Sequence, residues 1–186
     1  MYDPNFCIDT SRLTLTHFLP DKPEHCSFLV VLYNSPLFLS TEGQTDITTP
    51  EAAQKRIATR FVDEHKRNGY GTYLVSLKDT RKPIGSISLI KGDDPGSFEH
   101  PDIGFALIPD MVGKGYATEA AKAMLEFTGV KEYFGFTDPE NVPSTKVLER
   151  LGMERRGIRK LKPFGGREGL VYTAPGMGEL TGDAWD

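Results

Sequence analysis

The sequence predicts a mixed α/β fold in which a central twisted sheet of about six or seven strands is flanked by helices. Three observations favour this class: strand-like alternation in several segments, helical periodicity between them, and one unit at 102–137 in the order strand, helix, strand. Such crossovers are almost always right-handed and join parallel strands. The chain has 186 residues, the length of one domain. We therefore expect a single domain over 1–186, with its core at 8–173 and a tail at 174–186.

The first strand and helix lie before residue 34. Residues 11–16 alternate polar and apolar side chains, which indicates a half-buried strand. Residues 23–33 predict a short helix that ends before Pro36, because a residue that precedes proline is disfavoured in helical geometry. A loop is expected at 37–49.

A second helix and a hairpin follow that loop. Thr49 is a capping residue in front of a proline, and apolar residues then recur at helical spacing as far as Gly69. Strands at 72–78 and 84–90 are separated by a polar turn, which predicts an antiparallel hairpin. Residues 102–108 predict the next strand, which ends at a proline.

Two glycines stand between this strand and the next helix. Gly113 and Gly115 flank Lys114, and the helix that follows has an alanine-rich apolar face. Glycines let the backbone turn tightly, and the N–H groups at a helix start favour anions. No G-x-x-x-x-G-K-[ST] run is present, and Ala117 lies one position too early for a dinucleotide-binding fingerprint. The pattern predicts a phosphate-binding turn of another kind, with a structural loop as the alternative.

A further helix and three strands complete the prediction. The helix begins at Asn141 or Val142, of which Pro143 favours the second as the cap, and it ends at Gly152. The strands are expected at 131–137, 154–162 and 168–173.

The composition excludes several classes of protein. The chain carries 22 Lys and Arg against 26 Asp and Glu, a net charge of −4, which does not suit a nucleic-acid binder. The longest apolar run, 28–33, is far shorter than the roughly 20 residues that cross a bilayer. Residues 1–5 lack the features of a secretory signal. We therefore expect a cytoplasmic location, free thiols at both cysteines, and neither nucleic acid nor membrane as partner.

Two motifs resemble those of the GNAT superfamily of acyl-CoA-dependent N-acetyltransferases, and within it the RimJ/RimL-type branch. Residues 112–117, Val-Gly-Lys-Gly-Tyr-Ala, are similar to the family's Arg/Gln-x-x-Gly-x-Gly/Ala pyrophosphate loop. The asparagine-led helix, Asn141-x-x-Ser144 followed by 147–153, is similar to its second motif. The order of the expected strands fits the family over 8–173.

The resemblance implies acetyl-CoA as cosubstrate, bound in a cleft where the fourth and fifth strands are parallel and splay apart. The pantetheine arm would pair along the fourth strand, and the glycine loop would hold the pyrophosphate. Val112 departs from the Arg or Gln of many members, which leaves the backbone N–H groups for the phosphates. Asn141 has a second interpretation as a helix cap alone. The implied cofactor-binding residues are Leu107, Ile108, Val112, Gly113, Lys114, Gly115, Tyr116, Ala117, Asn141, Ser144 and Lys146.

The resemblance also implies candidates for the chemistry. Many members place a tyrosine at the position of Leu148, where it acts as the acid that protonates the coenzyme thiolate. The RimJ/RimL branch instead resembles an arrangement in which a serine of this helix reaches the coenzyme sulfur. Ser144 is therefore the candidate acid or thiol-orienting donor, and its alternative is to satisfy a backbone N–H group in the first turn.

The amine side has several candidates. Asp102 is favoured because the branch often carries an acid before Ile-Gly-aromatic, with Glu99 and His100 as alternatives. A carboxylate at a strand start is usually solvated. Phe38 belongs to the loop at 37–49, where the family shapes its acceptor pocket, and Phe38 and Asp102 are the expected acceptor contacts.

The expected activity is direct transfer of an acetyl group to a primary amine of a peptide N-terminus or a small molecule. At pH 7 an α-amine costs about 1 kcal/mol to deprotonate and a lysine-like amine about 4.6 kcal/mol, so a strong base is optional for an N-terminus. The alternative is an acyl-CoA-binding sensor or scaffold without turnover. We expect no metal, because the four histidines lack ligand spacing, and a homodimer is one candidate assembly.

Overall fold

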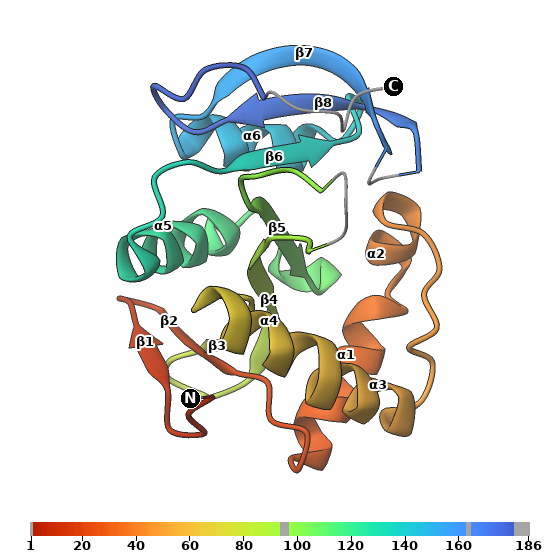
Figure 1. Ribbon diagram of the computed structural model, residues 1–186. Coiled ribbons are helices and arrows are strands. Elements are labelled where there is room, and N and C mark those ends of the chain that lie inside the picture. The colour runs from red at the N-terminus through yellow and green to blue at the C-terminus, as the bar shows by residue number, and fades with distance from the viewer. Residues whose placement is uncertain (1, 94–96, 163–164, 181–186) are drawn as a thin grey trace.

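The structure, a computed structural model, describes residues 2–93, 97–162 and 165–180, which form one eight-stranded sheet with helices on both faces (Figure 1). The strand order is β1-β2-β3-β4-β5-β6-β8-β7. All neighbouring strands are antiparallel except β5 and β6. The predicted mixed α/β class is therefore confirmed. The strands are β1 (Cys7–Asp9), β2 (Leu13–His17), β3 (Thr72–Leu77), β4 (Pro83–Ile90), β5 (Asp102–Leu107), β6 (Phe134–Thr137), β7 (Glu154–Leu161) and β8 (Arg167–Thr173).

The helices lie mostly where the sequence predicts them, and α1 has the expected bounds. The expected helix after Thr49 runs without a break from α3 to α4 but contains one π-helical stretch, η1. It ends at Gly69, whose φ of 76° suits glycine. The helices are α1 (Pro23–Tyr33), α2 (Pro36–Thr41), α3 (Pro50–Arg56), η1 (Ile57–Phe61), α4 (Val62–Asn68), η2 (Pro109–Met111), α5 (Tyr116–Thr128) and α6 (Val142–Arg150).

Two hydrophobic clusters pack on the two faces of the sheet. Successive side chains of β3 point to opposite faces, so Tyr73 and Val75 join one cluster and Leu74 joins the other. The first cluster includes Met124 of α5 and Leu148 of α6, and the second is built with α1, α3 and η1. The sheet is thus covered by α5 and α6 on one face and by α1 and α3 on the other.

The sheet opens between β5 and β6, as expected for the fourth and fifth strands of the prediction. The two parallel strands are paired at Asp102 and Phe134 alone. Beyond this pair β5 stays with β4 while β6 pairs with β8, and Figure 1 shows the two strands diverging near the middle of the molecule. The edges of β5 and β6 are therefore left without strand partners over most of their length.

Four predictions about elements are wrong in detail. The loop expected at 37–49 begins with α2, because the Ser35 Oγ accepts a hydrogen bond from the Phe38 N–H at 3.3 Å and caps a helix too short to show periodicity. The strand expected at 131–137 begins at Phe134. Asn141, rather than Val142, caps α6, because its side chain accepts a hydrogen bond that valine cannot accept. The short strand β1 is additional to the seven expected strands.

The tail expected at 174–186 is partly a packed segment. Ala174, Met177 and Leu180 are buried against the first hydrophobic cluster, and the Met177 carbonyl accepts a hydrogen bond from the Arg156 guanidinium. Residues 174–180 therefore belong to the core, and the remainder of the expected tail, 181–186, lies outside the described residues.

Candidate cofactor and acceptor site

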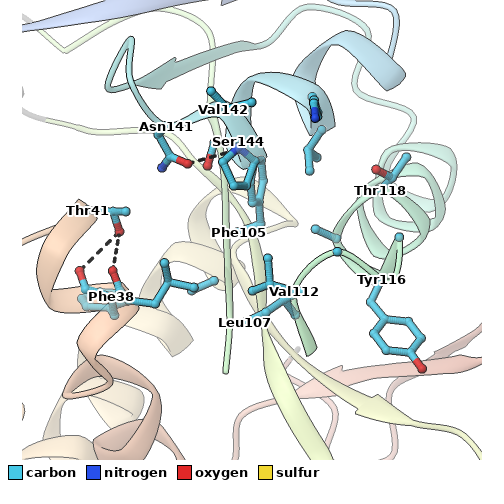
Figure 2. Close-up of a pocket in the computed structure, with 18 of the residues that line it drawn as sticks. Phe38, Thr41, Phe105, Leu107, Val112, Tyr116, Thr118, Asn141, Val142 and Ser144 are labelled. Carbon is cyan, nitrogen blue, oxygen red and sulfur yellow. Dashed lines mark hydrogen bonds between the residues drawn. The ribbon is translucent and has the colours of Figure 1, made fainter. Parts of the chain in front are cut away.

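Two cavities meet where β5 and β6 diverge. The first has a volume of about 350 Å³ and lies between the end of β5, the start of α5 and the start of α6 (Figure 2). The second, of about 400 Å³, is walled by β4, β5, β6 and α2. Their shared lining joins them into one site of two compartments. The shared residues are Phe38, Thr41, Glu42, Phe105, Ala106, Asn141 and Ser144.

The glycine loop forms the end of the first cavity beside α5. Gly113 and Gly115 both have φ near 80°, a left-handed conformation that residues with a Cβ adopt at a cost. Gly115 is the N-cap of α5 and supplies no side-chain cap. Within the described residues, no hydrogen bond is donated by the N–H groups of Gly113, Lys114 and Gly115. These unpaired donors at the positive end of a 13-residue helix suit a phosphate group.

A side chain in the first turn of α5 also lacks a partner. The Oγ1 atom of Thr118 is buried without a hydrogen bond in the described structure, and Thr118 lines the first cavity (Figure 2). A buried hydroxyl usually has a partner. The donors around this turn therefore fit an anionic group such as a diphosphate.

The start of α6 faces the glycine loop across the first cavity. Asn141 Oδ1 accepts a hydrogen bond from the Ser144 N–H at 3.2 Å, which is the capping role (Figure 2). Ser144 lines both cavities, and its hydroxyl makes no hydrogen bond in the described structure. Leu148, where many relatives are expected to have a tyrosine, is buried in the hydrophobic core.

Most of the predicted cofactor residues line the first cavity, and two do not. Ile108 continues the pairing of β5, since its N–H donates to the Ile84 carbonyl at 2.9 Å. Lys114 is exposed, and its Nζ atom lies 4.0 Å from Met111 Sδ. The predicted residues that do line the cavity are Leu107, Val112, Gly113, Gly115, Tyr116, Ala117, Asn141, Ser144 and Lys146.

Asp102 lies on the wall of the second cavity and is half-buried, whereas a strand-start carboxylate is usually solvated. Its Oδ1 atom is buried without a partner in the described residues. Burial raises the pKa of Asp102 well above its usual range, and the negative charge of Glu42 acts in the same direction. A carboxyl with a raised pKa can accept a proton from an amine near neutral pH.

The alternatives to Asp102 lie elsewhere. Neither Glu99 nor His100 lines the two cavities, and the His100 Nδ1 atom lies 3.8 Å from a Glu132 carboxylate oxygen. Of these three candidates for the amine side, Asp102 alone lines one of the two cavities.

An aromatic pair forms another wall of the second cavity. The ring of Phe38 stacks on that of Tyr33 with 4.4 Å between centroids and 14° between planes, and both residues line the cavity. Partial desolvation raises the pKa of the nearby Glu42, while the Arg167 guanidinium opposes that shift. The wall thus combines an aromatic face with carboxyl groups, a combination that attracts cations.

Two residues that touch the glycine loop were not predicted. Arg12 lies just before β2, about 100 positions away in sequence, and its guanidinium donates to the Lys114 carbonyl at 3.0 Å. Glu119 in the first turn of α5 pairs with Arg12 at 2.6 Å. An acid in the first turn of a helix, here Glu119, can be recognised in the sequence. Its partner Arg12 becomes apparent only in the fold, which places the start of β2 beside α5.

The divided sheet and the glycine turn at the start of α5 are the features to compare with known families. The family model described as an acetyltransferase (GNAT) domain matches residues 12–154. The chain therefore belongs to the GNAT acetyltransferase family.

The chain is also similar to individual proteins, and these similarities do not identify its acceptor. It is 36% identical over 108 residues to the uncharacterized N-acetyltransferase YnaD of Bacillus subtilis (strain 168), an alignment that spans 55% of this chain and 61% of that protein. A Salmonella typhimurium acetyltransferase that modifies the N-terminal serine of ribosomal protein L7/L12 has a TM-score of 0.71 at 17% identity, covering 95% of this chain and 100% of its own. The acetyltransferase MccE, solved with acetyl-CoA and AMP, has a TM-score of 0.71 at 16% identity, covering 92% and 94%. At such identities the two structures show the shared fold alone.

Two features are absent from the residues that the structure describes. No helix there has both the length and the apolar character needed to cross a bilayer. No group of three or more His, Cys, Asp or Glu side chains is arranged there to hold a metal ion.

Proposed function

We propose that this protein transfers the acetyl group of acetyl-CoA directly to a primary amine, on a peptide N-terminus or a small molecule, with both substrates bound at once. The observation that carries the proposal is the joined pair of cavities. One ends at a helix start with unpaired N–H groups, and the other is lined by Asp102, whose Oδ1 atom is buried and unpaired in the described structure. Family membership supports the same reaction class.

The first cavity would hold the cosubstrate. Backbone N–H groups of the glycine loop would bind the diphosphate, and the unpaired edge of β5 near Leu107 would receive the amides of the pantetheine arm. Lys146 lines the same cavity with a positive charge that suits a further phosphate. When bound, acetyl-CoA would supply the activated acetyl thioester.

Residues that line one or both of the two cavities would carry the chemistry. In this proposal Asp102 accepts the proton of the acceptor amine, and the Ser144 hydroxyl donates to the departing sulfur. Phe38 and Tyr33 pack against the acceptor. An α-amine costs less free energy to deprotonate than a lysine-like amine, so a single carboxyl group with a raised pKa suffices as its base.

A binding protein without turnover is the second candidate, favoured by the buried Leu148 at the position of the usual tyrosine. Thiol release from acetyl-CoA, measured with a panel of peptides, polyamines and amino sugars, separates the two. Release that depends on an acceptor supports the enzyme. Tight coenzyme binding without release for any acceptor would favour the sensor.

The cofactor loop itself is tested by Gly113→Ala, measured by calorimetric titration with coenzyme A. A methyl group there meets open space but requires the left-handed backbone, which costs about 1–2 kcal/mol, so the loop should relax and coenzyme affinity should fall about tenfold. Gly129→Ala is the matched control, because Gly129 ends the same helix with φ of 67° and also has open space. It should cost similar stability and leave affinity unchanged. Equal affinities for the wild type and Gly113→Ala would remove the loop from the site.

A further inference from the structure

Arg12 contacts the glycine loop, residues 113–115, but does not line the first cavity. Its Nη1 atom donates to the Lys114 carbonyl at 3.0 Å, and its guanidinium carbon lies 4.6 Å from the centroid of the Tyr116 ring. The Nη2 atom is 3.5 Å from the place that a Cβ on Gly115 would occupy. Arg12 does not line the first cavity, whereas Gly115 does. In Figure 2 the Tyr116 ring points away from Ser144 and Val142.

Glu119 fixes the position of this guanidinium. Its Oε2 atom accepts from Arg12 Nε at 2.7 Å and pairs with Nη2 at 2.6 Å. Its Oε1 atom accepts from the Thr10 hydroxyl at 2.6 Å, the Ser11 hydroxyl at 3.0 Å and the Arg12 N–H at 3.0 Å. Desolvation by itself would raise the pKa of Glu119, but the hydrogen bonds from Thr10 and Arg12 bring it below its usual value. Glu119 is therefore a charged anchor that joins the start of β2 to the start of α5.

The peptide bond is planar, so a contact that fixes the Lys114 carbonyl also fixes the N–H group of Gly115. In a trans peptide the C=O of one residue and the N–H of the next point in opposite directions. Because Arg12 holds the Lys114 carbonyl, it also fixes the direction of the Gly115 N–H, which belongs to the same peptide plane and to a residue that lines the first cavity. Loss of Arg12 would free this peptide to rotate, and it would also leave the Glu119 charge uncompensated beside an anion site.

We propose that Arg12 and Glu119 are positioning residues for a diphosphate-bearing ligand. Arg12 sets the orientation of the Lys114–Gly115 peptide, and Glu119 orients Arg12. This inference rests on the proposed function, since the ligand it names is the diphosphate portion of coenzyme A. In this proposal Arg12 orders the donors of a loop in which residue 112 is a valine and offers no polar side chain.

The test compares two ligands in calorimetric titrations of the full chain: coenzyme A, and pantetheine, which lacks the diphosphate. Arg12→Met should weaken coenzyme A binding at least tenfold and change pantetheine binding by less than twofold. Glu119→Gln, a milder change that leaves a hydrogen-bond acceptor, should produce the same pattern at smaller size. Arg12→Lys restores the charge without the planar fork and should recover less than half of the lost factor.

Arg67→Met is the matched control, because Arg67 also pairs with a carboxylate, Asp93, at 2.9 Å and donates to a carbonyl, that of Lys91, at 3.3 Å, away from both cavities. It should leave both affinities unchanged. Equal weakening of both ligands by Arg12→Met, or full recovery by Arg12→Lys, would overturn the positioning role. If Arg12→Met does not fold, as judged by circular dichroism, Glu119→Gln decides. Absence of coenzyme A binding to the wild type would instead remove the proposed function.

Discussion

At the scale of single residues, the candidate site combines groups that the fold leaves without partners. Asp102 Oδ1 and Thr118 Oγ1 are both buried and unpaired in the described structure, and each lines one of the two cavities. An unpaired buried polar group costs about 1–3 kcal/mol. A ligand in these cavities would be able to complete the hydrogen bonds of both groups.

Replacement of Asp102 by Asn should affect rate and stability in opposite directions. Loss of the base should reduce kcat/KM about 10²–10⁴-fold. Because folding raises the pKa of Asp102, the folded protein loses stability as pH rises through that raised value, and Asn does not ionise. Asp102→Asn should therefore be more stable than the wild type at alkaline pH, as measured by urea unfolding across pH.

Glu99→Gln is the control for that prediction, because Glu99 lines neither cavity. It should change neither rate nor the pH dependence of stability. An Asp102→Asn enzyme with undiminished kcat/KM would exclude Asp102 as the base.

At the scale of elements, the two helix starts that face the first cavity are treated differently. The start of α5 has no side-chain cap, whereas α6 is capped by Asn141. The Asn141 side chain caps with its acceptor, Oδ1, and its donor group, Nδ2, makes no hydrogen bond in the described structure. The cap and a ligand contact are therefore compatible in this one side chain.

Two substitutions at Asn141 separate these roles. Asn141→Ala removes the cap and should lower the free energy of unfolding by about 1 kcal/mol. Asn141→Asp keeps a good cap and should restore that stability, but it lacks the Nδ2 donor and adds a negative charge, so coenzyme affinity should stay reduced. Urea unfolding and calorimetry measure the two effects. Full recovery of affinity in Asn141→Asp would reduce Asn141 to a cap.

At the scale of the whole molecule, an aromatic cluster ties the N-terminal segment to the sheet. His17 stacks between Tyr2 and Phe6 with centroid distances of 4.2 and 4.3 Å, and His65 of α4 meets its ring edge-on at 4.5 Å. Burial lowers the pKa of both histidines, and that of His65 falls to about 4. The folded state therefore holds these rings neutral.

This arrangement predicts that mild acid destabilises the protein. The unfolded chain binds protons at His65 below about pH 6.5 and the folded chain only near pH 4, so stability is complete above the first value and falls between the two, by about 3 kcal/mol at most. His65→Gln should flatten this fall in thermal unfolding measured across pH. His100→Gln, outside the cluster, should leave it unchanged. The same slope in His65→Gln and the wild type would assign the acid sensitivity elsewhere.

The sequence by itself determined the features that depend on neighbouring residues. The bounds of α1, the antiparallel hairpin of β3 and β4, and the glycine turn before α5 follow from local periodicity and turn chemistry, which act over a few positions. The short elements β1 and α2 escaped prediction, since three and six residues carry too little periodic signal.

Only the tertiary structure decided which distant groups share a site. The burial of Asp102, its charge coupling to Glu42, and the anchor from Arg12 to Glu119 all depend on the order of strands in the sheet and on the opening between β5 and β6. No local pattern reports such contacts, because the residues that make them are separated by 60 to 107 positions and their desolvation comes from elements between them.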